Sequence, residues 1–236
     1  LIMRKHELGA AGDRVVIEER LRGEEVSYHI VCDGRRYLPM AASQDHKAAF
    51  EGDKGPNTGG MGAYSPPPIV TPEMEKTIIE QVVEPTIAGL KKREIDFRGV
   101  LYFGLMVVDG VPNVLEFNTR FGDPETQVLV TRWRGDIVDL LMDSARGDLS
   151  AVAPRWEAPA SVCVVLASGG YPGSYAKGME ISGLDQAAAL EGVQVFHAGT
   201  ALKGGKVVTS GGRVLSVTAA GPDIDTAAEL AYQGVS

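Results

Sequence analysis

This sequence of 236 residues has few cysteines, no long apolar run and no excess of basic residues. The longest strongly apolar run, residues 100–108, is too short to cross a bilayer, and no signal peptide is visible. Acidic residues outnumber lysine and arginine by 31 to 23, and the formal net charge of −8 disfavours a nonspecific binder of nucleic acid or of acidic membranes. The two cysteines, Cys32 and Cys163, lie far apart in apolar stretches, which favours buried reduced thiols in a cytoplasmic protein over a disulfide framework.

The remaining composition, 44% hydrophobic and 23% charged, is typical of a globular chain with a substantial core. The element pattern predicts an α+β fold in two parts, because hairpins and helices fill the first two thirds and short strands dominate the rest. We place the parts at residues 1–155 and 156–236, with the linker in the proline-containing stretch 151–160. The chain starts at Leu1 and ends close to a predicted helix, so we expect it to be a fragment of a longer protein.

Local signals predict the individual elements. Thr71-Pro72-Glu73 should start a helix that ends or kinks at Pro85, and Asp123 and Asp136 should cap two later helices. Predicted strands cover residues 14–19, 26–32, 36–40, 100–108, 111–117, 161–167, 193–198, 206–209 and 213–218, and predicted helices cover residues 124–133, 137–146 and 225–232.

The end of the strand at residues 111–117 carries the most informative side chains. Alternation along an extended backbone puts Glu116, Asn118 and Arg120 on one side. A carboxylate, an amide oxygen and a guanidinium together suit Mg²⁺ with a bound phosphate. A polar strand edge that faces solvent is the competing interpretation, and Glu116 and Asn118 alone would favour it.

A second unusual stretch, residues 41–68, is long, poor in apolar residues and rich in glycine. Glycines allow backbone N–H groups to approach an anion closely. The side chains in this region that could face a substrate are Asp45, His46, Lys47, Asn57 and Thr58, together with the backbone of Gly59 and Gly60. A mobile surface loop is the alternative, and the residues of this stretch alone favour it.

The run Arg120-Phe-Gly-Asp-Pro-Glu-Thr-Gln127 resembles a motif of the phosphoribosylamine–glycine ligases, also called glycinamide ribonucleotide synthetases, in the ATP-grasp superfamily. Similar matches occur at residues 43–47, 55–64, 168–173, 196–200 and 209–213, and the similarity covers roughly residues 12–232. The resemblance implies an ATP-grasp lobe of mainly antiparallel sheet with helices over residues 1–155, followed by a small β-rich domain over residues 156–236.

The resemblance also implies an activity. Enzymes of this family join glycine to 5-phosphoribosylamine through glycyl phosphate, with ATP as co-substrate and Mg²⁺ or Mn²⁺ as cofactor, in de novo purine biosynthesis. The implied roles are metal ligation by Glu116 and Asn118, catalysis by Arg120 and Asp123, and ATP binding by Glu18, Glu19, Leu21 and Glu25. Residues 100–106 contain no acidic residue, where many ATP-grasp enzymes carry another metal-binding glutamate, so metal affinity without nucleotide should be weak.

The same resemblance implies that the family's N-terminal domain and most of the lobe that grips the ATP phosphates are missing. We therefore expect the isolated fragment to bind nucleotide but to be inactive. Two alternatives stay open: another ATP-grasp carboxylate–amine ligase, such as a relative of biotin carboxylase, and a non-catalytic nucleotide-binding module. The sequence leaves open the preferred metal and the oligomeric state.

Overall fold

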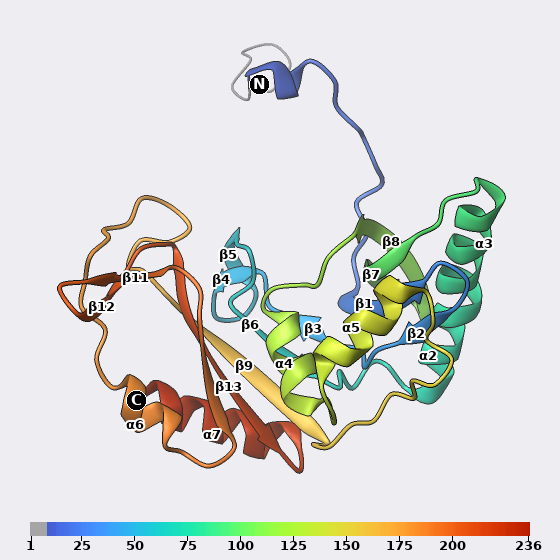
Figure 1. The fold of residues 1–236 in the computed structure, drawn as a ribbon. Helices are drawn as coiled ribbons and strands as arrows, with labels where there is room; N and C mark the ends of the chain where they lie inside the picture. The colour runs from blue at the N-terminus through green and yellow to red at the C-terminus, as the bar shows by residue number, and fades with distance from the viewer. Residues whose placement is uncertain (1–8) are drawn as a thin grey trace.

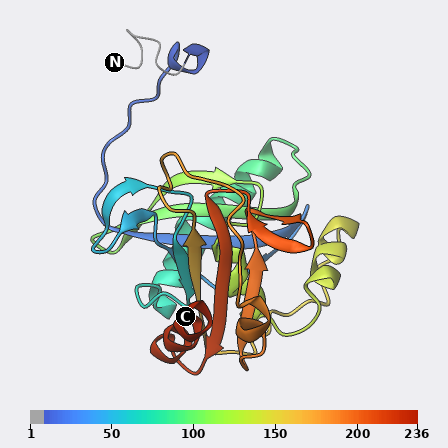
Figure 2. The same ribbon diagram turned by 90° about the vertical axis from the view of Figure 1, so that its left-hand side faces the viewer.

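Two antiparallel sheets form the framework of the protein, in a computed structural model that describes residues 9–236 (Figures 1 and 2). One sheet lies on each side of the view in Figure 1, with helices α4 (Glu125–Arg132) and α5 (Ile137–Arg146) between them. Every paired strand in both sheets runs antiparallel to its neighbour. The predicted α+β class is therefore confirmed.

The first sheet has the order β2-β1-β7-β8. Its strands are β1 (Glu24–Asp33), β2 (Tyr37–Pro39), β7 (Arg98–Val108) and β8 (Val111–Asn118). The hairpin between β7 and β8 turns at Asp109 and Gly110, which have φ angles of 49° and 78°. Two consecutive positive φ values match the twist of the flanking strands, and Asp-Gly is a sequence that adopts them readily. The strands predicted at residues 26–32 and 36–40, and at residues 100–108 and 111–117, are therefore confirmed and pair as two antiparallel hairpins.

The two faces of this sheet differ, because side chains alternate along each strand. On one face, Tyr28, Ile30 and Phe103 are buried under a helical segment that runs from residue 72 to residue 92. On the other face, α5 covers only the apolar half, where Leu140 packs against Val31. The polar half of that second face holds the candidate functional site.

The helical segment over the first face has three parts: α2 (Pro72–Ile78), a π-helical turn η2 (Ile79–Val83) and α3 (Glu84–Lys92). The Thr71 hydroxyl caps the start by accepting a bond from the Met74 N–H at 3.2 Å. The π-helical turn ends at Val83, two residues before Pro85. Proline has no N–H to donate to the helical hydrogen-bond pattern. The predicted interruption at Pro85 is thus a change of helical hydrogen bonding, after which the helix continues.

The second sheet has the order β10-β13-β9-β6-β3 and draws strands from both ends of the chain. Its strands are β3 (Gln44–Asp45), β6 (Gly62–Ser65), β9 (Ala160–Ala167), β10 (Val193–His197) and β13 (Arg213–Gly221). The remaining elements are the 3₁₀ helix η1 (Gly9–Gly12), the hairpins β4–β5 (Ala48–Phe50, Lys54–Asn57) and β11–β12 (Thr200–Lys203, Lys206–Thr209), and helices α6 (Leu184–Ala188) and α7 (Ile224–Val235). The division of the chain at residue 155 stays a prediction.

Two local predictions are wrong. Residues 14–19 form no strand, and Val16 and Ile17 are 83% and 91% exposed. An extended segment needs a neighbouring strand to bond to, and none of the described strands pairs with this one. Asp123 does not cap α4, because its carboxylate instead accepts hydrogen bonds from the side chains of Arg213 and Gln127.

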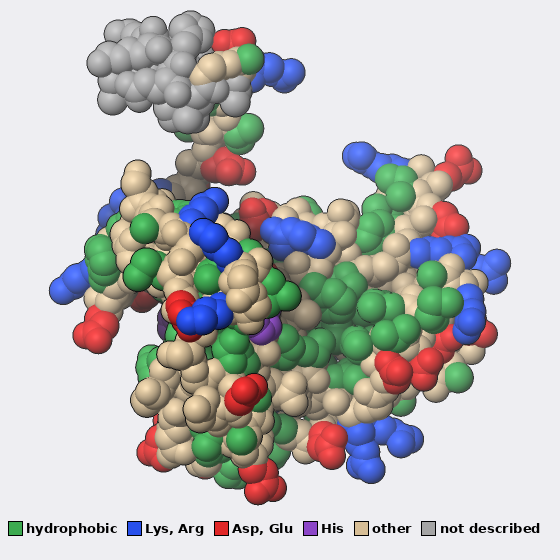
Figure 3. Space-filling model, turned by 60° about the vertical axis from the view of Figure 1, so that its left-hand side comes forward, with side chains coloured by type: hydrophobic (Ala, Val, Ile, Leu, Met, Phe, Trp, Pro, Cys, Tyr) green, Lys and Arg blue, Asp and Glu red, His purple; other side chains and the backbone are tan. Residues whose placement is uncertain are grey.

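The surface shows no concentration of one charge on the face drawn in Figure 3, where acidic and basic side chains of the described residues are interspersed. No helix among residues 9–236 combines the length and the apolar character needed to cross a membrane.

Candidate functional site

A cleft of about 230 Å³ opens on the polar half of the first sheet. We call it the polar cleft, and its lining residues include Glu25, Ser27, Asp45, Lys47, Asn57, Tyr102, Gly104 and Glu116. Five of these, from β1, β3, β5, β8 and the segment after β3, are among the residues that the sequence singled out. The fold therefore brings together side chains that are up to 91 positions apart, from Glu25 to Glu116.

Glu116 and Asn118 lie side by side at the end of β8, as alternation predicted. The Asn118 amide donates to Glu116 Oε1 at 3.1 Å. Rotation of that amide by half a turn would present its oxygen beside the carboxylate instead. Gly104 lies opposite Glu116 in the sheet, and a Cβ there would come within 3.0 Å of Glu116 Cγ. The missing side chain at Gly104 gives the carboxylate the space that it occupies.

The donor set at this pair fits Mg²⁺ or Mn²⁺ only in part. A carboxylate oxygen and an amide oxygen are hard ligands of the kind that Mg²⁺ prefers. Among the described residues, however, no group of three or more His, Cys, Asp or Glu side chains could hold a metal ion. A divalent ion at Glu116 and Asn118 would need further oxygen ligands from water or from a bound phosphate.

A lysine between two carboxylates forms the other side of the polar cleft. Lys47 Nζ donates to Glu25 and, at 3.2 Å, to Asp45 Oδ1. Burial alone would lower the pKa of Lys47, but the two carboxylates outweigh it and raise the pKa above its usual value. Lys47 is therefore a fixed positive charge beside the cleft, and Glu25 is already paired with it.

A buried carboxylate lies beneath the cleft. Glu125, at the start of α4, accepts hydrogen bonds from Tyr102 at 2.8 Å and from Ser27 at 3.0 Å. Burial, followed by the nearby charge of Asp45, raises the pKa of Glu125. Glu125 belongs to the run 120–127, but the sequence did not single it out as a site residue. Its partners come together only because β1, which carries Ser27, pairs with the strand that carries Tyr102.

This network predicts a pH-dependent effect of Glu125→Gln. A glutamine can accept the same two hydroxyl bonds without the cost of a buried charge. Because the folded pKa lies above the unfolded value, the wild type loses stability as pH rises from the unfolded pKa of about 4.3 through the folded pKa. We expect the variant to match the wild type below about pH 4 and to gain about 1 kcal/mol above the folded pKa. Urea unfolding at several pH values measures this, and a constant difference across pH would contradict it.

His29 is a fully buried residue that the sequence did not single out. Its ring stacks on Tyr102 at 4.4 Å, and its Nε2 accepts the Gly122 N–H at 3.2 Å. Burial, with a smaller contribution from Arg120, lowers the pKa of His29 to about 3. A neutral imidazole thus ties β1 to the loop that joins β8 to α4.

The two predicted catalytic residues lie along that loop. The Arg120 guanidinium donates to the Phe121 carbonyl at 2.9 Å and makes no bond or ion pair with Glu116 or Asn118 among the described contacts. Asp123 accepts from Arg213 and from Gln127, each at 2.9 Å. The structure therefore unites Glu116 with Asn118 but leaves Arg120 apart from that pair.

The glycine-rich segment is held by bonds within the chain. The Thr58 N–H donates to the Lys47 carbonyl at 2.7 Å, the Gly59 N–H to the Tyr171 hydroxyl at 3.1 Å, and the Gly60 N–H to the Thr58 hydroxyl at 3.0 Å. An anion on this segment would have to displace one of these acceptors. Asn57, which lines the polar cleft, offers its side chain without such an exchange.

Four predicted residues lie elsewhere. His46 directly follows β3, its ring centroid lies 5.6 Å from that of Tyr64, and it lines a different cleft. Glu18 and Glu19 are exposed and Leu21 is partly buried, in a segment outside the described strands, and none of the three lines the polar cleft.

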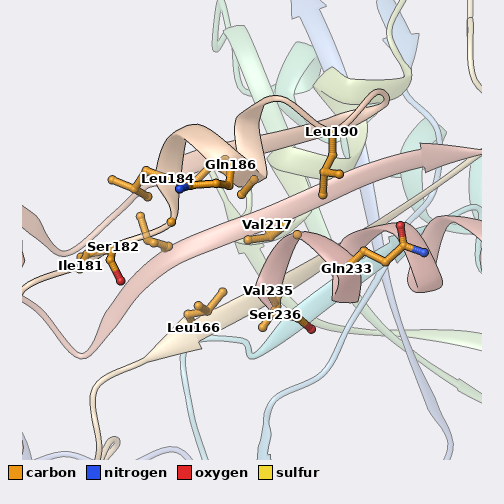
Figure 4. A pocket seen from close by; sticks show the side chains of 15 residues that line it. Leu166, Ile181, Ser182, Leu184, Gln186, Leu190, Val217, Gln233, Val235 and Ser236 are labelled. Carbon is orange, nitrogen blue, oxygen red and sulfur yellow. The ribbon is translucent and has the colours of Figure 1, made fainter.

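A second pocket, about 440 Å³ in volume, lies among α6, α7 and strands β9, β10 and β13. In Figure 4, Leu166, Leu190 and Val217 point into it, and Gln233 borders it. None of its lining side chains is charged. It therefore lacks the groups that phosphate or metal chemistry requires.

Comparison with known proteins identifies the family. Residues 1–126 match the model described as phosphoribosylglycinamide synthetase, ATP-grasp (A) domain, and residues 161–236 match the C domain of the same family. The chain belongs to the phosphoribosylglycinamide synthetase family. The resemblance carried by residues 120–127 is thereby confirmed.

Relatives in this synthetase family are named phosphoribosylamine–glycine ligase. One from Allochromatium vinosum is 54% identical over 228 residues, which are 96% of this chain and 53% of that protein. One from Vigna unguiculata is 46% identical over 97% of this chain and 75% of that protein. The chain spans about half the length of curated bacterial relatives such as the Allochromatium protein.

Solved structures agree with the family assignment. The phosphoribosylamine–glycine ligase of Thermotoga maritima superposes with a TM-score of 0.80 and 40% identity over 92% of this chain and 53% of that one. N5-carboxyaminoimidazole ribonucleotide synthetase of the same organism gives a TM-score of 0.62 at 13% identity, over 94% of this chain and 55% of that one, and shows a shared fold alone.

Proposed function

We propose that the polar cleft is the metal- and phosphate-binding part of a phosphoribosylamine–glycine ligase that acts in the cytoplasm. The observation that carries this proposal is the adjacent Glu116–Asn118 pair, whose Glu116 lines the same cleft as Lys47 and Asn57, in a chain of this family. The reaction joins glycine to 5-phosphoribosylamine at the expense of ATP. Mg²⁺ or Mn²⁺, held by Glu116 and Asn118, would neutralise charge on the ATP phosphates.

The chemistry divides into two steps. A carboxylate is a poor electrophile, so an oxygen of the glycine carboxylate first attacks the γ-phosphorus of ATP, and ADP leaves. The amine nitrogen of 5-phosphoribosylamine then attacks the carbonyl carbon of glycyl phosphate, loses a proton, and inorganic phosphate leaves. The protein contributes mainly positioning and fixed charge.

The residues of the chain take the following proposed roles. Arg120 would balance negative charge on the transferring phosphoryl group after its guanidinium leaves the Phe121 carbonyl. Lys47 keeps its positive charge between Asp45 and Glu25 and would bind an anionic substrate once one of these carboxylates releases it. Asp123 would act beside the glycine-rich segment, which Arg213 joins to it.

The ATP-binding roles carry less structural support. Glu25 lines the cleft and would accept the ribose hydroxyls only by sharing or releasing Lys47. Glu18, Glu19 and Leu21 remain candidates on the basis of the resemblance, and His46 and Thr58 on the basis of their places beside the glycine-rich segment.

The test uses the 236-residue chain and a chimera in which it replaces the matching 228 residues of the Allochromatium vinosum relative. We expect the chain alone to bind ATP with Mg²⁺ in calorimetry and to release no ADP with glycine and 5-phosphoribosylamine. The chimera should form glycinamide ribonucleotide. A chimera that binds ATP but does not ligate, beside an active Allochromatium parent, would overturn the proposal.

A further inference from the structure

Arg213 connects three segments that are distant in sequence. It lies at the start of β13 in the second sheet, and its guanidinium reaches the segment that precedes α4. One nitrogen, Nη1, donates to the Gly59 carbonyl at 2.6 Å and to the Asp123 carbonyl at 2.7 Å. The other, Nη2, donates to Asp123 Oδ2 at 2.9 Å. A planar guanidinium can serve several acceptors in fixed directions, which an ammonium group cannot do.

Tyr171 holds the same glycine from the other side. The Tyr171 hydroxyl accepts the Gly59 N–H, so both the amide and the carbonyl of Gly59 are bonded to side chains from the C-terminal part of the chain. Gly212 makes this possible, because a Cβ there would lie 2.3 Å from Tyr171 Cδ2. A substitution at Gly212 would displace the tyrosine ring.

The glycine-rich segment also packs directly on the segment before α4. Gly60 has a φ of 109°, and a Cβ there would lie 2.5 Å from Pro124 Cδ. Arg213 and this close approach together leave little freedom between Gly60 and Asp123. The Asp123 carboxylate, whose partners are Arg213 and Gln127, stays half exposed.

We propose that Arg213 and Tyr171 are positioning residues that join the glycine-rich segment to Asp123 and so build one binding surface for glycine and 5-phosphoribosylamine. This inference rests on the proposed function above. The two residues lie on the glycine-rich side of the site, while the Glu116–Asn118 pair is built from β8 without them. Their loss should therefore affect glycine and 5-phosphoribosylamine more than ATP.

The first test measures the contacts without any assay of activity. Amide hydrogen exchange is followed by NMR in the 236-residue chain. We expect Tyr171→Phe to speed exchange at the Gly59 N–H about tenfold or more, as the loss of one hydrogen bond would allow. Amides of β7 should not change. Unchanged exchange at Gly59 would overturn the positioning role, whatever the enzyme assays show.

The second test separates positioning from structural support. In the chimera, Arg213→Met should raise the KM for glycine or 5-phosphoribosylamine about tenfold or more and leave the KM for ATP within about twofold. Arg213→Lys keeps the positive charge but not the planar guanidinium, so its KM for the affected substrate should lie between those of the unaltered chimera and of Arg213→Met. Arg155→Met removes an exposed arginine from the linker region and should match the unaltered chimera.

The outcomes distinguish the two proposals. A parallel fall in kcat with all KM values unchanged, or full recovery by lysine, would contradict the positioning role while leaving the ligase assignment intact. If the unaltered chimera binds ATP but fails to ligate, the proposed function fails, and the exchange measurement at Gly59 still decides whether the two side chains hold the segment.

Discussion

Glu116→Gln should abolish most ligation while leaving the fold unchanged. Glutamine keeps the size and one oxygen of the side chain but removes the charge that would bind a divalent ion beside Asn118. We expect kcat/KM of the chimera to fall at least about 100-fold, the usual cost of losing one charge-stabilising group in an active site. The melting temperature should not change, because Glu116 is exposed and the one hydrogen bond described for its side chain is to the Asn118 amide beside it on the same strand. Initial rates of ADP release measure the effect.

A matched control is available in the C-terminal part of the chain. Glu191 is exposed, lies between α6 and β10, and does not line the polar cleft. Glu191→Gln removes the same charge and should leave both rate and stability unchanged. Ligation by Glu116→Gln at a rate near that of the control would refute the metal assignment.

Asp33→Asn should cause a large loss of stability, although the substitution changes neither the size nor the shape of the side chain. The Asp33 carboxylate is 3% exposed, and it accepts the backbone N–H groups of Arg35 at 2.8 Å and Leu149 at 3.0 Å, as well as that of Arg36. Asparagine would direct an NH₂ group toward one of these donors. We expect a loss of about 2–3 kcal/mol, the cost of a charged hydrogen bond plus an unsatisfied donor. Urea denaturation at about pH 7 measures this loss in the free energy of unfolding.

The same substitution has a defined pH dependence. Burial would raise the pKa of Asp33, but the three backbone donors outweigh burial and lower it. A lowered folded pKa contributes stability that is present above the unfolded pKa of about 3.9 and is lost as pH falls through the folded pKa. The difference between Asp33→Asn and the wild type should therefore shrink in acid. A difference that persists unchanged at about pH 2 would contradict this explanation.

Local sequence signals predicted most of the framework. Asp109-Gly110 marked its hairpin because few other dipeptides adopt two positive φ angles, and Thr71 and Asp136 marked helix starts because their side chains satisfy free N–H groups. The predictions that were wrong depended on partners distant in sequence. Residues 14–19 contain a short run of β-branched residues that is typical of a strand, but they have no neighbour among the described strands. Asp123 bonds to Arg213 instead of to the helix.

At the candidate site, too, local features were predicted correctly and contacts between distant residues were not. Alternation correctly placed Glu116 beside Asn118, since two residues on one strand share a face. It could not show that β1 would place Ser27 and His29 next to Tyr102, and so Glu125 and His29 were missed. Nor could glycine content show that the N–H groups of residues 58–60 would be used within the chain.

The most direct measurement of the central claim is Mn²⁺ binding to the 236-residue chain, followed by electron paramagnetic resonance with and without ATP. The two proposed ligands are one carboxylate and one amide, and no cluster of three or more His, Cys, Asp or Glu among the described residues could hold a metal ion, so binding of the metal alone should be weak. We predict that protein-bound Mn²⁺ appears only with ATP present and disappears in Glu116→Gln, while Glu191→Gln behaves like the wild type. Equal Mn²⁺ binding by the wild type and Glu116→Gln in the presence of ATP would contradict the account.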